Sequence, residues 1–223
     1  MEHLPIFINL KQKPALVVGG GDIALRKINL LLKAKAKVDC LSPLFCEDIN
    51  TLFKDGYIKL IKKSFEQADI KDYSVIIAAT DDSSVNSLIS SIAHDKRIPV
   101  NVVDSPTLSS FIMPSIVDRS PLIIAVSSSG KAPVLSRIIR AKLETVIPSA
   151  YGILADIAGE YRQKVKDRFS KIKDRRAFWE ATFSGVIAEK VFSGRINEAK
   201  NDIEKQLNDS VEMELGEVYL VGA

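Results

Sequence analysis

The sequence predicts an α/β fold in which a parallel sheet comes first and a helical region follows. Between Ala15 and Val103, short segments that are apolar throughout alternate with segments of helical periodicity. Strands that are apolar on both faces are typical of a parallel sheet covered by helices on both sides. From Tyr151 to Leu207 the periodicity is helical only.

The predicted sheet begins at Ala15–Val18, which Gly19, Gly20 and Gly21 bring to an end. A helix over Ile23–Lys35 follows, because its apolar residues recur at helical spacing. The remaining strands and helices are short and are bounded by turn residues. In chain order they are Val38–Leu41, a helix at Cys46–Phe53, Ile58–Ile61, Val75–Ala79, a helix at Val85–Ala93, and Val100–Val103.

The pattern changes after Asp104. Phe111–Met113 and Leu122–Val126 are predicted strands, and a helix begins near Pro133 and ends before Pro148. One stripe of this helix is too apolar for a free surface, so we expect it to be buried at a homodimer interface. The stripe comprises Val134, Leu135, Ile138, Ile139, Leu143 and Val146.

Two apolar stripes define the helical region. The first consists of Leu154, Ile157, Tyr161, Val165 and Phe169, and the second begins with Phe178, Phe183, Val186 and Ile187. The segment Gly216–Ala223, which reads GEVYLVGA, predicts a return to strand structure.

Composition limits the possible functions. The chain has 223 residues, a formal net charge of +3 and two cysteines, Cys40 and Cys46, which form neither a disulfide framework nor a zinc motif. Residues Met1–Leu10 do not resemble a signal peptide, and no apolar run is long enough to span a membrane. A cytoplasmic protein without membrane or nucleic-acid partners is therefore expected. The basic stretch Arg162–Arg176 has no recognisable aromatic stacking platform, which favours a solvated helix face.

The turn after the first strand fits the dinucleotide-binding pattern G-x-G-x-x-A and lies between a strand and a helix, as that pattern requires. It predicts a Rossmann-type domain whose helix N-terminus faces a pyrophosphate, while a purely structural tight turn is the alternative. The candidate cofactor residues of this turn are Gly19, Gly21, Asp22 and Ile23.

The end of the second strand departs from the fingerprint, because no carboxylate stands there to bind a ribose. Ser42, Pro43 and Leu44 are the candidates for that contact, and the lack of an arginine favours NAD over NADP. Further along, Thr80, Asp81 and Asn101 lie near strand ends on the expected cofactor side. The alternative for Asp81 and Asp82 is N-capping of the next helix.

Three longer segments, Ala78–Asn86, Val100–Leu122 and Ala125–Glu144, accompany the glycine-rich LVVGGGDIALRK. Together they closely resemble the precorrin-2 dehydrogenase / sirohydrochlorin ferrochelatase family, the N-terminal half of bacterial sirohaem synthase. The resemblance implies NAD-dependent oxidation of precorrin-2 to sirohydrochlorin, insertion of ferrous iron, and a homodimer. It also implies a Rossmann domain at 1–113, a dimerisation segment at 114–147, a helical domain at 148–210, and a linker with a truncated methyltransferase start at 211–223.

Both implied reactions need a general base beside the macrocycle. Asp104 follows the strand Val100–Val103, and ligands of open α/β sheets bind beyond such strand ends. Many family members carry a second aspartate next, but this chain has Ser105, so Asp104 is the catalytic candidate. The alternative is that Asp104 caps the turn through Ser105 and Pro106.

The carboxylate-fringed substrate suggests an anion site where the loop Ser127–Gly130 meets the next helix. Its candidate residues are Ser128, Lys131, Arg119 and Arg137, with solvated surface charges as the alternative. Neither His3 nor His94 belongs to a metal-binding motif. The macrocycle itself is the metal's ligand, so the metal preference between iron, cobalt and nickel stays open.

Two other functions compete with this interpretation. The segment Ile76–Asn86 also resembles non-enzymatic NAD-sensing Rossmann domains that regulate potassium transport, although these typically carry an acidic residue at the end of the second strand. The other is an ordinary small-molecule dehydrogenase whose helical tail serves only dimerisation. Mixing protein, precorrin-2 and NAD separates them, because a sensor binds NAD without changing the tetrapyrrole spectrum.

Overall fold

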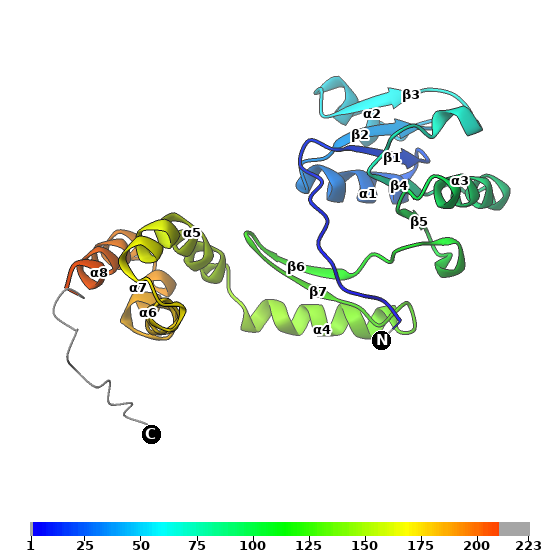
Figure 1. Cartoon of the computed structure of the whole chain (residues 1–223). Coiled ribbons are helices and arrows are strands. Elements are labelled where there is room, and N and C mark those ends of the chain that lie inside the picture. The colour runs from blue at the N-terminus through cyan, green and yellow to red at the C-terminus, as the bar shows by residue number, and fades with distance from the viewer. Residues whose placement is uncertain (1, 210–223) are drawn as a thin grey trace. The chain divides into compact units, whose positions relative to one another are not determined.

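The computed structural model describes residues 2–209 and consists of two compact units. The first unit contains residues 2–114 and 127–133, and the second contains residues 115–126 and 134–209. Figure 1 shows both, with the sheet in the first and the helices α5 to α8 in the second. The predicted strand at Gly216–Ala223 lies outside the described residues.

The first unit is built on a parallel sheet of five strands in the order β3-β2-β1-β4-β5 (Figure 1). This order, with β1 at the centre and a crossover on each side, is that of a Rossmann half-domain. The strands are β1 (Pro14–Val18), β2 (Lys37–Leu41), β3 (Ile58–Ile61), β4 (Val75–Ala78) and β5 (Val100–Val102). The helices are α1 (Asp22–Lys33), α2 (Glu47–Lys54) and α3 (Ser83–Asp95), with the 3₁₀ turns η1 (Gln67–Asp69) and η2 (Pro106–Leu108).

Side chains alternate between the two faces of this sheet and enter two separate cores. Val17 and Ile77 pack with α1 and α2 on one face. Leu16 and Ile76 pack with α3 on the other. All four side chains are fully buried, as expected for central strands covered on both sides. The α/β prediction with a Rossmann-type parallel sheet is therefore confirmed.

The strand predicted at Phe111–Met113 is wrong. That segment follows the outer edge of β5, and serine hydroxyls take the place of a neighbouring strand. Ser110 Oγ accepts a hydrogen bond from the backbone N–H of Val100 at 2.8 Å, and Ser109 Oγ accepts one from that of Val102 at 2.9 Å. The edge of the sheet is thus satisfied without a further ladder.

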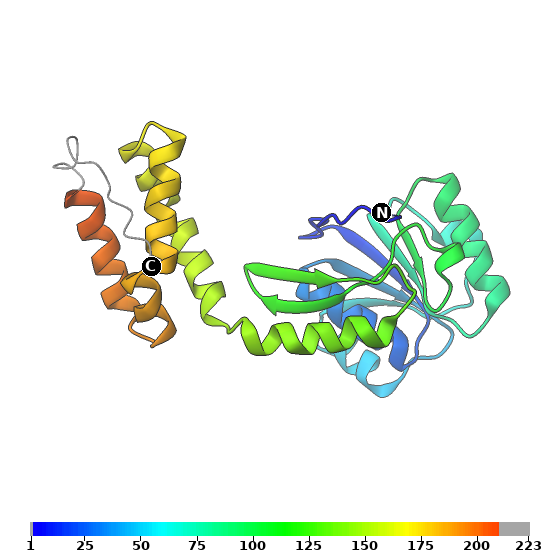
Figure 2. The same cartoon turned by 90° about the horizontal axis from the view of Figure 1, so that it is seen from below.

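The second unit begins with an antiparallel hairpin of β6 (Ser115–Arg119) and β7 (Leu122–Val126). Helices follow, as Figure 2 shows from a second direction. They are α4 (Pro133–Val146), α5 (Ala150–Arg168), α6 (Ile172–Ser184), α7 (Val186–Phe192) and α8 (Ile196–Asp209). Among residues 2–209, none of the helices is long and apolar enough to cross a membrane.

Helices α5 to α8 enclose a core of their own. The predicted stripe of α5 is buried at Leu154, Ile157, Tyr161 and Val165, with Phe169 packed against it. The second predicted stripe is only half right. Phe178 and Ile187 are buried, but Phe183 and Val186 are exposed, because extended backbone at Gly185 separates α6 from α7 and changes the direction of the chain.

In a single chain, helix α4 buries a polar residue and leaves its apolar residues exposed. Its only buried residue is the polar Ser136. Leu135 and Ile138, from the apolar stripe, are 52% and 47% exposed. The stripe that the sequence predicts to be buried is therefore open in one copy of the chain, so its burial against a second copy stays a prediction.

Candidate functional site

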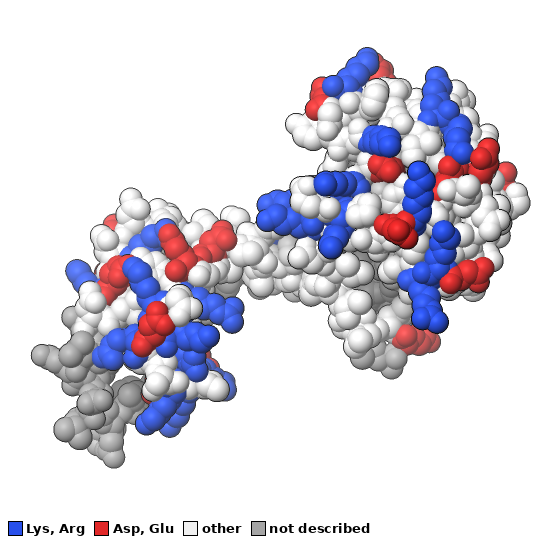
Figure 3. Space-filling view, turned by 45° about the horizontal axis from the view of Figure 1, so that its top comes forward, with Lys and Arg blue, Asp and Glu red and all other residues white. Residues whose placement is uncertain are grey.

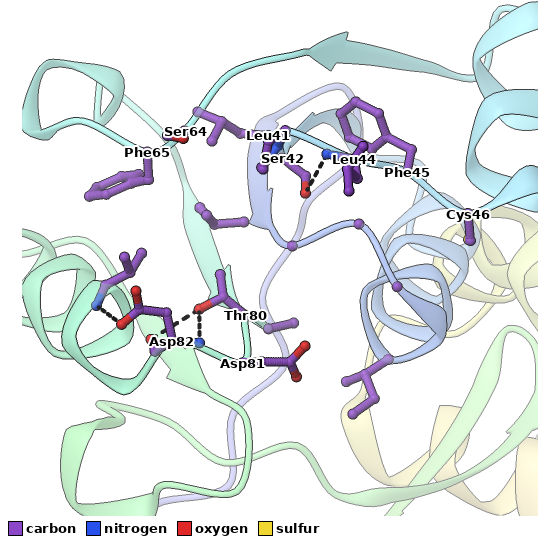
Figure 4. Close-up of a pocket in the computed structure, with 18 of the residues that line it drawn as sticks. Leu41, Ser42, Leu44, Phe45, Cys46, Ser64, Phe65, Thr80, Asp81 and Asp82 are labelled. Atoms are coloured by element: carbon purple, nitrogen blue, oxygen red, sulfur yellow. Dashed lines mark hydrogen bonds between the residues drawn. The ribbon is translucent and has the colours of Figure 1, made fainter.

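A pocket of about 850 Å³ opens beyond the carboxyl ends of β1, β2 and β4. In an open α/β sheet this is where ligands bind. Figure 4 shows its walls, with the residues that follow β2 on one side and those that follow β4 on the other. The lining includes nine predicted cofactor residues, namely Gly19, Gly21, Asp22, Ile23, Ser42, Pro43, Leu44, Thr80 and Asp81.

The glycine-rich turn forms the floor of the pocket. Glycines are required at two of its positions, because neighbouring backbone leaves no room for a side chain. Gly19 has a φ of 131°, and a Cβ at this position would collide with the carbonyl oxygen of Ala79. A Cβ on Gly20 would collide with the carbonyl oxygen of Leu44. Gly21 is different, because nothing lies within 4 Å of where its Cβ would be. The turn therefore presents bare backbone to open pocket space at Gly21.

Helix α1 begins at this turn with its N-terminus unsatisfied by side chains. Gly21 is the N-cap residue and makes no side-chain cap hydrogen bond. The first N–H groups of α1 and the positive end of its dipole are thus free to bind an anion. This arrangement fits the pyrophosphate of a dinucleotide.

The end of β2 supplies a hydroxyl and backbone to the pocket, and no carboxylate. Ser42 is buried, and its Oγ accepts a hydrogen bond from the backbone N–H of Leu44 at 3.4 Å (Figure 4). Asp39 lies within β2 and accepts a hydrogen bond from the Tyr73 hydroxyl at 2.8 Å. Burial, together with the hydrogen bond to Asp39, raises the pKa of Tyr73. No lysine or arginine is among the described residues that line the pocket, which fits an unphosphorylated ribose.

The two aspartates after β4 have different roles. Asp82 is the N-cap of α3 and accepts hydrogen bonds from the N–H groups of Ser84 and Val85, as the capping alternative predicts. Hydrogen bonds from Ser84 and Val85 lower the pKa of its carboxyl group. The carboxylate of Asp81 makes no hydrogen bond within residues 2–209 and lines the pocket beside Thr80 (Figure 4).

Several lining residues were not predicted from the sequence, and one predicted cofactor residue lies outside the pocket. Gly20, Phe45, Cys46, Ser64 and Phe65 also line the pocket. The three consecutive glycines signalled the first of these, whereas Ser64 and Phe65 follow β3, to which no motif pointed. Asn101 does not line the pocket. It is buried, and its Nδ2 donates to the carbonyl oxygen of Phe111 at 3.1 Å, so it holds the segment after η2.

Asp104 follows β5 in a left-handed conformation with a φ of 56°, which is uncommon for residues other than glycine. It is exposed, and within the described part of the chain its carboxylate accepts no hydrogen bond. The capping contact that the alternative requires is thus absent from residues 2–209. Burial and the neighbouring Arg26 lower the pKa of Lys27 on α1, whereas the nearby carboxylate of Asp104 raises it. Asp104 is therefore near enough to the ammonium group of Lys27 to influence its pKa.

Two of the predicted substrate residues lie in the loop before α4, and a third lies on α4 itself. The Oγ of Ser128 accepts a hydrogen bond from the N–H of Ala132 at 2.9 Å. Lys131 forms an exposed ion pair with Glu2 at 3.1 Å, and Arg137 is exposed on α4. Residues 2–209 contain no cluster of three or more His, Cys, Asp or Glu side chains that could hold a metal ion.

Arg119 has a structural role that the sequence did not indicate. Its guanidinium donates to the carbonyl oxygens of Ile147 at 2.7 Å, Glu144 at 3.1 Å and Asp118 at 3.1 Å. It thus joins the end of β6 to the C-terminal end of α4, where carbonyl groups lack helical partners. Its predicted contact with substrate stays a prediction.

The five-stranded order, the uncapped helix and the bare glycine turn define a Rossmann-class protein with a pocket of the dinucleotide-binding type. Three family models match the chain: "Putative NAD(P)-binding" at residues 6–115, "Sirohaem biosynthesis protein central" at 119–145, and "Sirohaem synthase dimerisation region" at 150–207. The chain belongs to the sirohaem synthase family.

Named relatives agree with this assignment. The whole chain aligns with the siroheme synthase of Ruthia magnifica subsp. Calyptogena magnifica at 60% identity and with that of Methylobacillus flagellatus at 50% identity. It covers 47% and 48% of these proteins, so it spans about half of their length. A solved structure named "SirC, precorrin-2 dehydrogenase" shares the fold, with a TM-score of 0.72 and 21% identity over 93% of this chain and all of that one.

The dimerisation model matches the helices α5 to α8, at residues 150–207. From the family resemblance, the dimerisation segment is expected at 114–147 and a helical domain at 148–210. The family comparison therefore adds α5–α8 as a dimerisation region, and the predicted domain bounds stay a prediction.

Proposed function

We propose that the chain oxidises precorrin-2 to sirohydrochlorin with NAD and then inserts ferrous iron to give sirohaem. One observation carries the first half of this proposal: the pocket presents bare backbone at Gly21 and an uncapped helix to a dinucleotide. The names of the relatives supply the substrate, because they are siroheme synthases and a precorrin-2 dehydrogenase.

The residues of the chain divide the work. The N–H groups at the start of α1 bind the pyrophosphate, and the Ser42–Leu44 segment holds the adenosine ribose. NAD, when bound, accepts a hydride from the macrocycle. Asp104 takes the proton that leaves with it, so that precorrin-2 and NAD⁺ give sirohydrochlorin, NADH and a proton.

Asp104 also serves chelation in this proposal. Entry of ferrous iron displaces two pyrrole N–H protons, and a nearby base accelerates their departure. Ser128, Lys131, Arg119 and Arg137 are the proposed contacts to the rim carboxylates. Iron is a substrate here, so the protein needs no resident metal site.

NAD is the proposed cofactor in preference to NADP, since no described lining residue is a lysine or arginine that could bind a 2′-phosphate. The proposed assembly is a homodimer in the cytoplasm, where a reducing environment keeps the thiols of Cys40 and Cys46 free. Neither nucleic acid nor membrane is a proposed partner.

The decisive experiment mixes the protein with precorrin-2 and NAD and records the absorption spectrum over time. We expect conversion to the sirohydrochlorin spectrum with equal formation of NADH, followed by a further change on addition of ferrous iron. An NAD-sensing domain would bind the dinucleotide and leave the tetrapyrrole spectrum unchanged. An ordinary dehydrogenase would likewise fail to oxidise precorrin-2.

A further inference from the structure

The charged side chains that line the cofactor pocket all have the same sign. They are the carboxylates of Asp22, Asp81 and Asp82, and the described lining residues include no lysine, arginine or histidine. The surface of the first unit outside the pocket is different, because Figure 3 shows basic and acidic side chains interspersed on its visible face. A dinucleotide in the pocket would therefore lie close to negative charge from the protein.

Two of the three carboxylates have a role at the start of a helix. Asp82 caps α3 through its hydrogen bonds from the N–H groups of Ser84 and Val85. Asp22 belongs to the first turn of α1, where the helix dipole favours an acidic side chain. Asp81 has neither role. It is exposed, lines the pocket, and forms no hydrogen bond or ion pair within residues 2–209, so its charge is available to a ligand (Figure 4).

The position of Asp81 relates it to one half of a dinucleotide. The start of α1 is the site for the pyrophosphate, and the segment Ser42–Leu44 after β2 is the proposed site of the adenosine ribose. Strands β2 and β4 lie on opposite sides of the central strand β1. A dinucleotide spans the crevice between the two sides of such a sheet, so its second nucleotide extends towards the end of β4. Asp81 follows β4 and lies on this side of the pocket.

We propose that the carboxylate of Asp81 makes the pocket select the oxidised form of the cofactor. This inference rests on the proposed function, whose cofactor is NAD. The nicotinamide ring of NAD⁺ carries a positive charge that the ring of NADH lacks, while the adenosine and the pyrophosphate are the same in both. A carboxylate on the nicotinamide side attracts the charged ring and gives no such attraction to the neutral one.

The direction of this selectivity suits an enzyme that oxidises its substrate. NAD⁺ is held with its ring charge near Asp81, which favours the form that can accept a hydride. Transfer of the hydride neutralises the ring and removes the attraction. NADH therefore leaves the pocket more readily than it would without this change of charge.

The test is a pair of binding titrations of the full chain, one with NAD⁺ and one with NADH, without tetrapyrrole or iron. The readout is the dissociation constant for NADH divided by that for NAD⁺, because contacts to the adenosine and the pyrophosphate cancel in this ratio. The unmodified chain should give a ratio above one. Asp81→Asn should lower the ratio about fivefold, the effect of removing one partly solvated charge contact. Asp81→Glu keeps the charge and should retain most of the ratio.

Salt provides a second measurement of the same charge contact. Raising the ionic strength from about 0.05 M to about 0.5 M screens exposed charges. The ratio of the unmodified chain should therefore fall with added salt, and the ratio of Asp81→Asn should change much less. An equal response of the two proteins to salt would contradict a role for the Asp81 charge.

Asp22→Asn is the matched control, because Asp22 lines the same pocket but lies at the start of α1, beside the pyrophosphate site. It should change the affinities for both forms by the same factor and leave the ratio unchanged. An unchanged ratio in Asp81→Asn, or an equal fall in Asp22→Asn, would overturn the proposal. A chain that shows the predicted ratios without oxidising precorrin-2 would overturn the proposed function alone, whereas a chain that binds neither form would overturn both.

Discussion

Asp104 is the residue on which the proposed chemistry depends most. Its carboxylate follows β5, is exposed and has no hydrogen bond within residues 2–209, so it remains available to accept a proton. We expect Asp104→Asn to slow precorrin-2 oxidation by about 10²–10⁴-fold, the usual contribution of a general base. Iron insertion should slow as well. The affinity for NAD should stay unchanged, because the glycine turn is untouched. Stopped-flow rates and an NAD titration on the same variant measure all three.

Asp95→Asn is a suitable control, because Asp95 is an exposed carboxylate at the end of α3. It should leave both rates at the level of the unmodified protein. If Asp104→Asn keeps both rates within a few-fold of that level, Asp104 is a turn residue and the base must be sought elsewhere.

Gly21 offers a test of the cofactor pocket that does not disturb the fold. Its φ of −95° suits any residue, and the space where a side chain would project is open. Gly21→Asp should therefore fold, yet abolish NAD binding, since a carboxylate would meet the pyrophosphate. Gly21→Ala should have a much smaller effect. Iron insertion into ready-made sirohydrochlorin should survive, because that step needs no nicotinamide, and equal loss of both activities would contradict the assignment.

The buried thiol of Cys40 should make the stability of the fold depend on pH. Its thiol is fully buried and donates to the carbonyl oxygen of Gly19 at 3.3 Å, and burial raises its pKa from 9.0 to about 12. Between these values the unfolded thiol has lost its proton while the folded one retains it. The free energy of unfolding should fall as pH rises from 9 towards 12, by at most about 1.4 kcal/mol per pH unit from this group.

Denaturant unfolding at pH 8, 9 and 10 measures this effect, with Cys40→Ala as the comparison. The variant should be less stable at pH 8, and its unfolding free energy should decrease less steeply with pH. Cys46→Ala is the control, since Cys46 is only half-buried. Parallel curves for Cys40→Ala and the unmodified chain would show that the thiol does not contribute.

At the scale of elements, Arg119 joins β6 to α4. The guanidinium satisfies carbonyl oxygens of Glu144 and Ile147 at the end of α4, which would otherwise lack partners. Arg119→Gln should lower the free energy of unfolding by about 1–3 kcal/mol, the usual cost of leaving such groups unpaired. Thermal unfolding followed by circular dichroism measures this loss.

The same variant separates the two roles considered for Arg119. If Arg119 is purely structural, Arg119→Gln should lower the free energy of unfolding. The dissociation constant of the folded variant for sirohydrochlorin should stay within about twofold of the unmodified protein, because the substituted side chain does not touch the substrate. A large loss of affinity with unchanged stability would instead place Arg119 in the substrate site.

At the scale of the whole molecule, the exposed apolar stripe of α4 predicts a homodimer. A single chain leaves Val134, Leu135, Ile138 and Ile139 between 39% and 60% exposed. Apolar surface gathered on one helix face in this way is typical of an interface. Ile138→Glu should therefore produce a monomer at micromolar concentration, because it would place a charge in the buried contact.

Light scattering measures the change, and Lys142→Glu on the same helix controls for altered charge, since Lys142 is exposed. A dimer that survives Ile138→Glu would leave residues 150–207, which match the dimerisation family model, as the contact region. A stable, active monomer of the unmodified chain would refute the homodimer altogether.

Periodicity in the sequence was enough to predict the α/β class, the five strands of the sheet and most helices, because burial on both faces or on one stripe leaves a local pattern. The glycine turn was equally predictable, since its requirements are those of backbone within a few residues. Nine residues of the cofactor pocket followed from that turn and from the ends of β2 and β4.

The remaining features depend on contacts between segments that no local pattern connects. The amide of Asn101 bonds to Phe111, and the guanidinium of Arg119 bonds to Glu144 and Ile147, contacts that the sequence did not indicate. Their roles at the cofactor and the substrate stay predictions. Phe65 lines the pocket, and Trp179 lines a hollow between α5 and α6, because the fold brings separate segments together. A polar side chain bonds to whichever unpaired group the fold brings within about 3 Å, so its role is known only when the elements have packed.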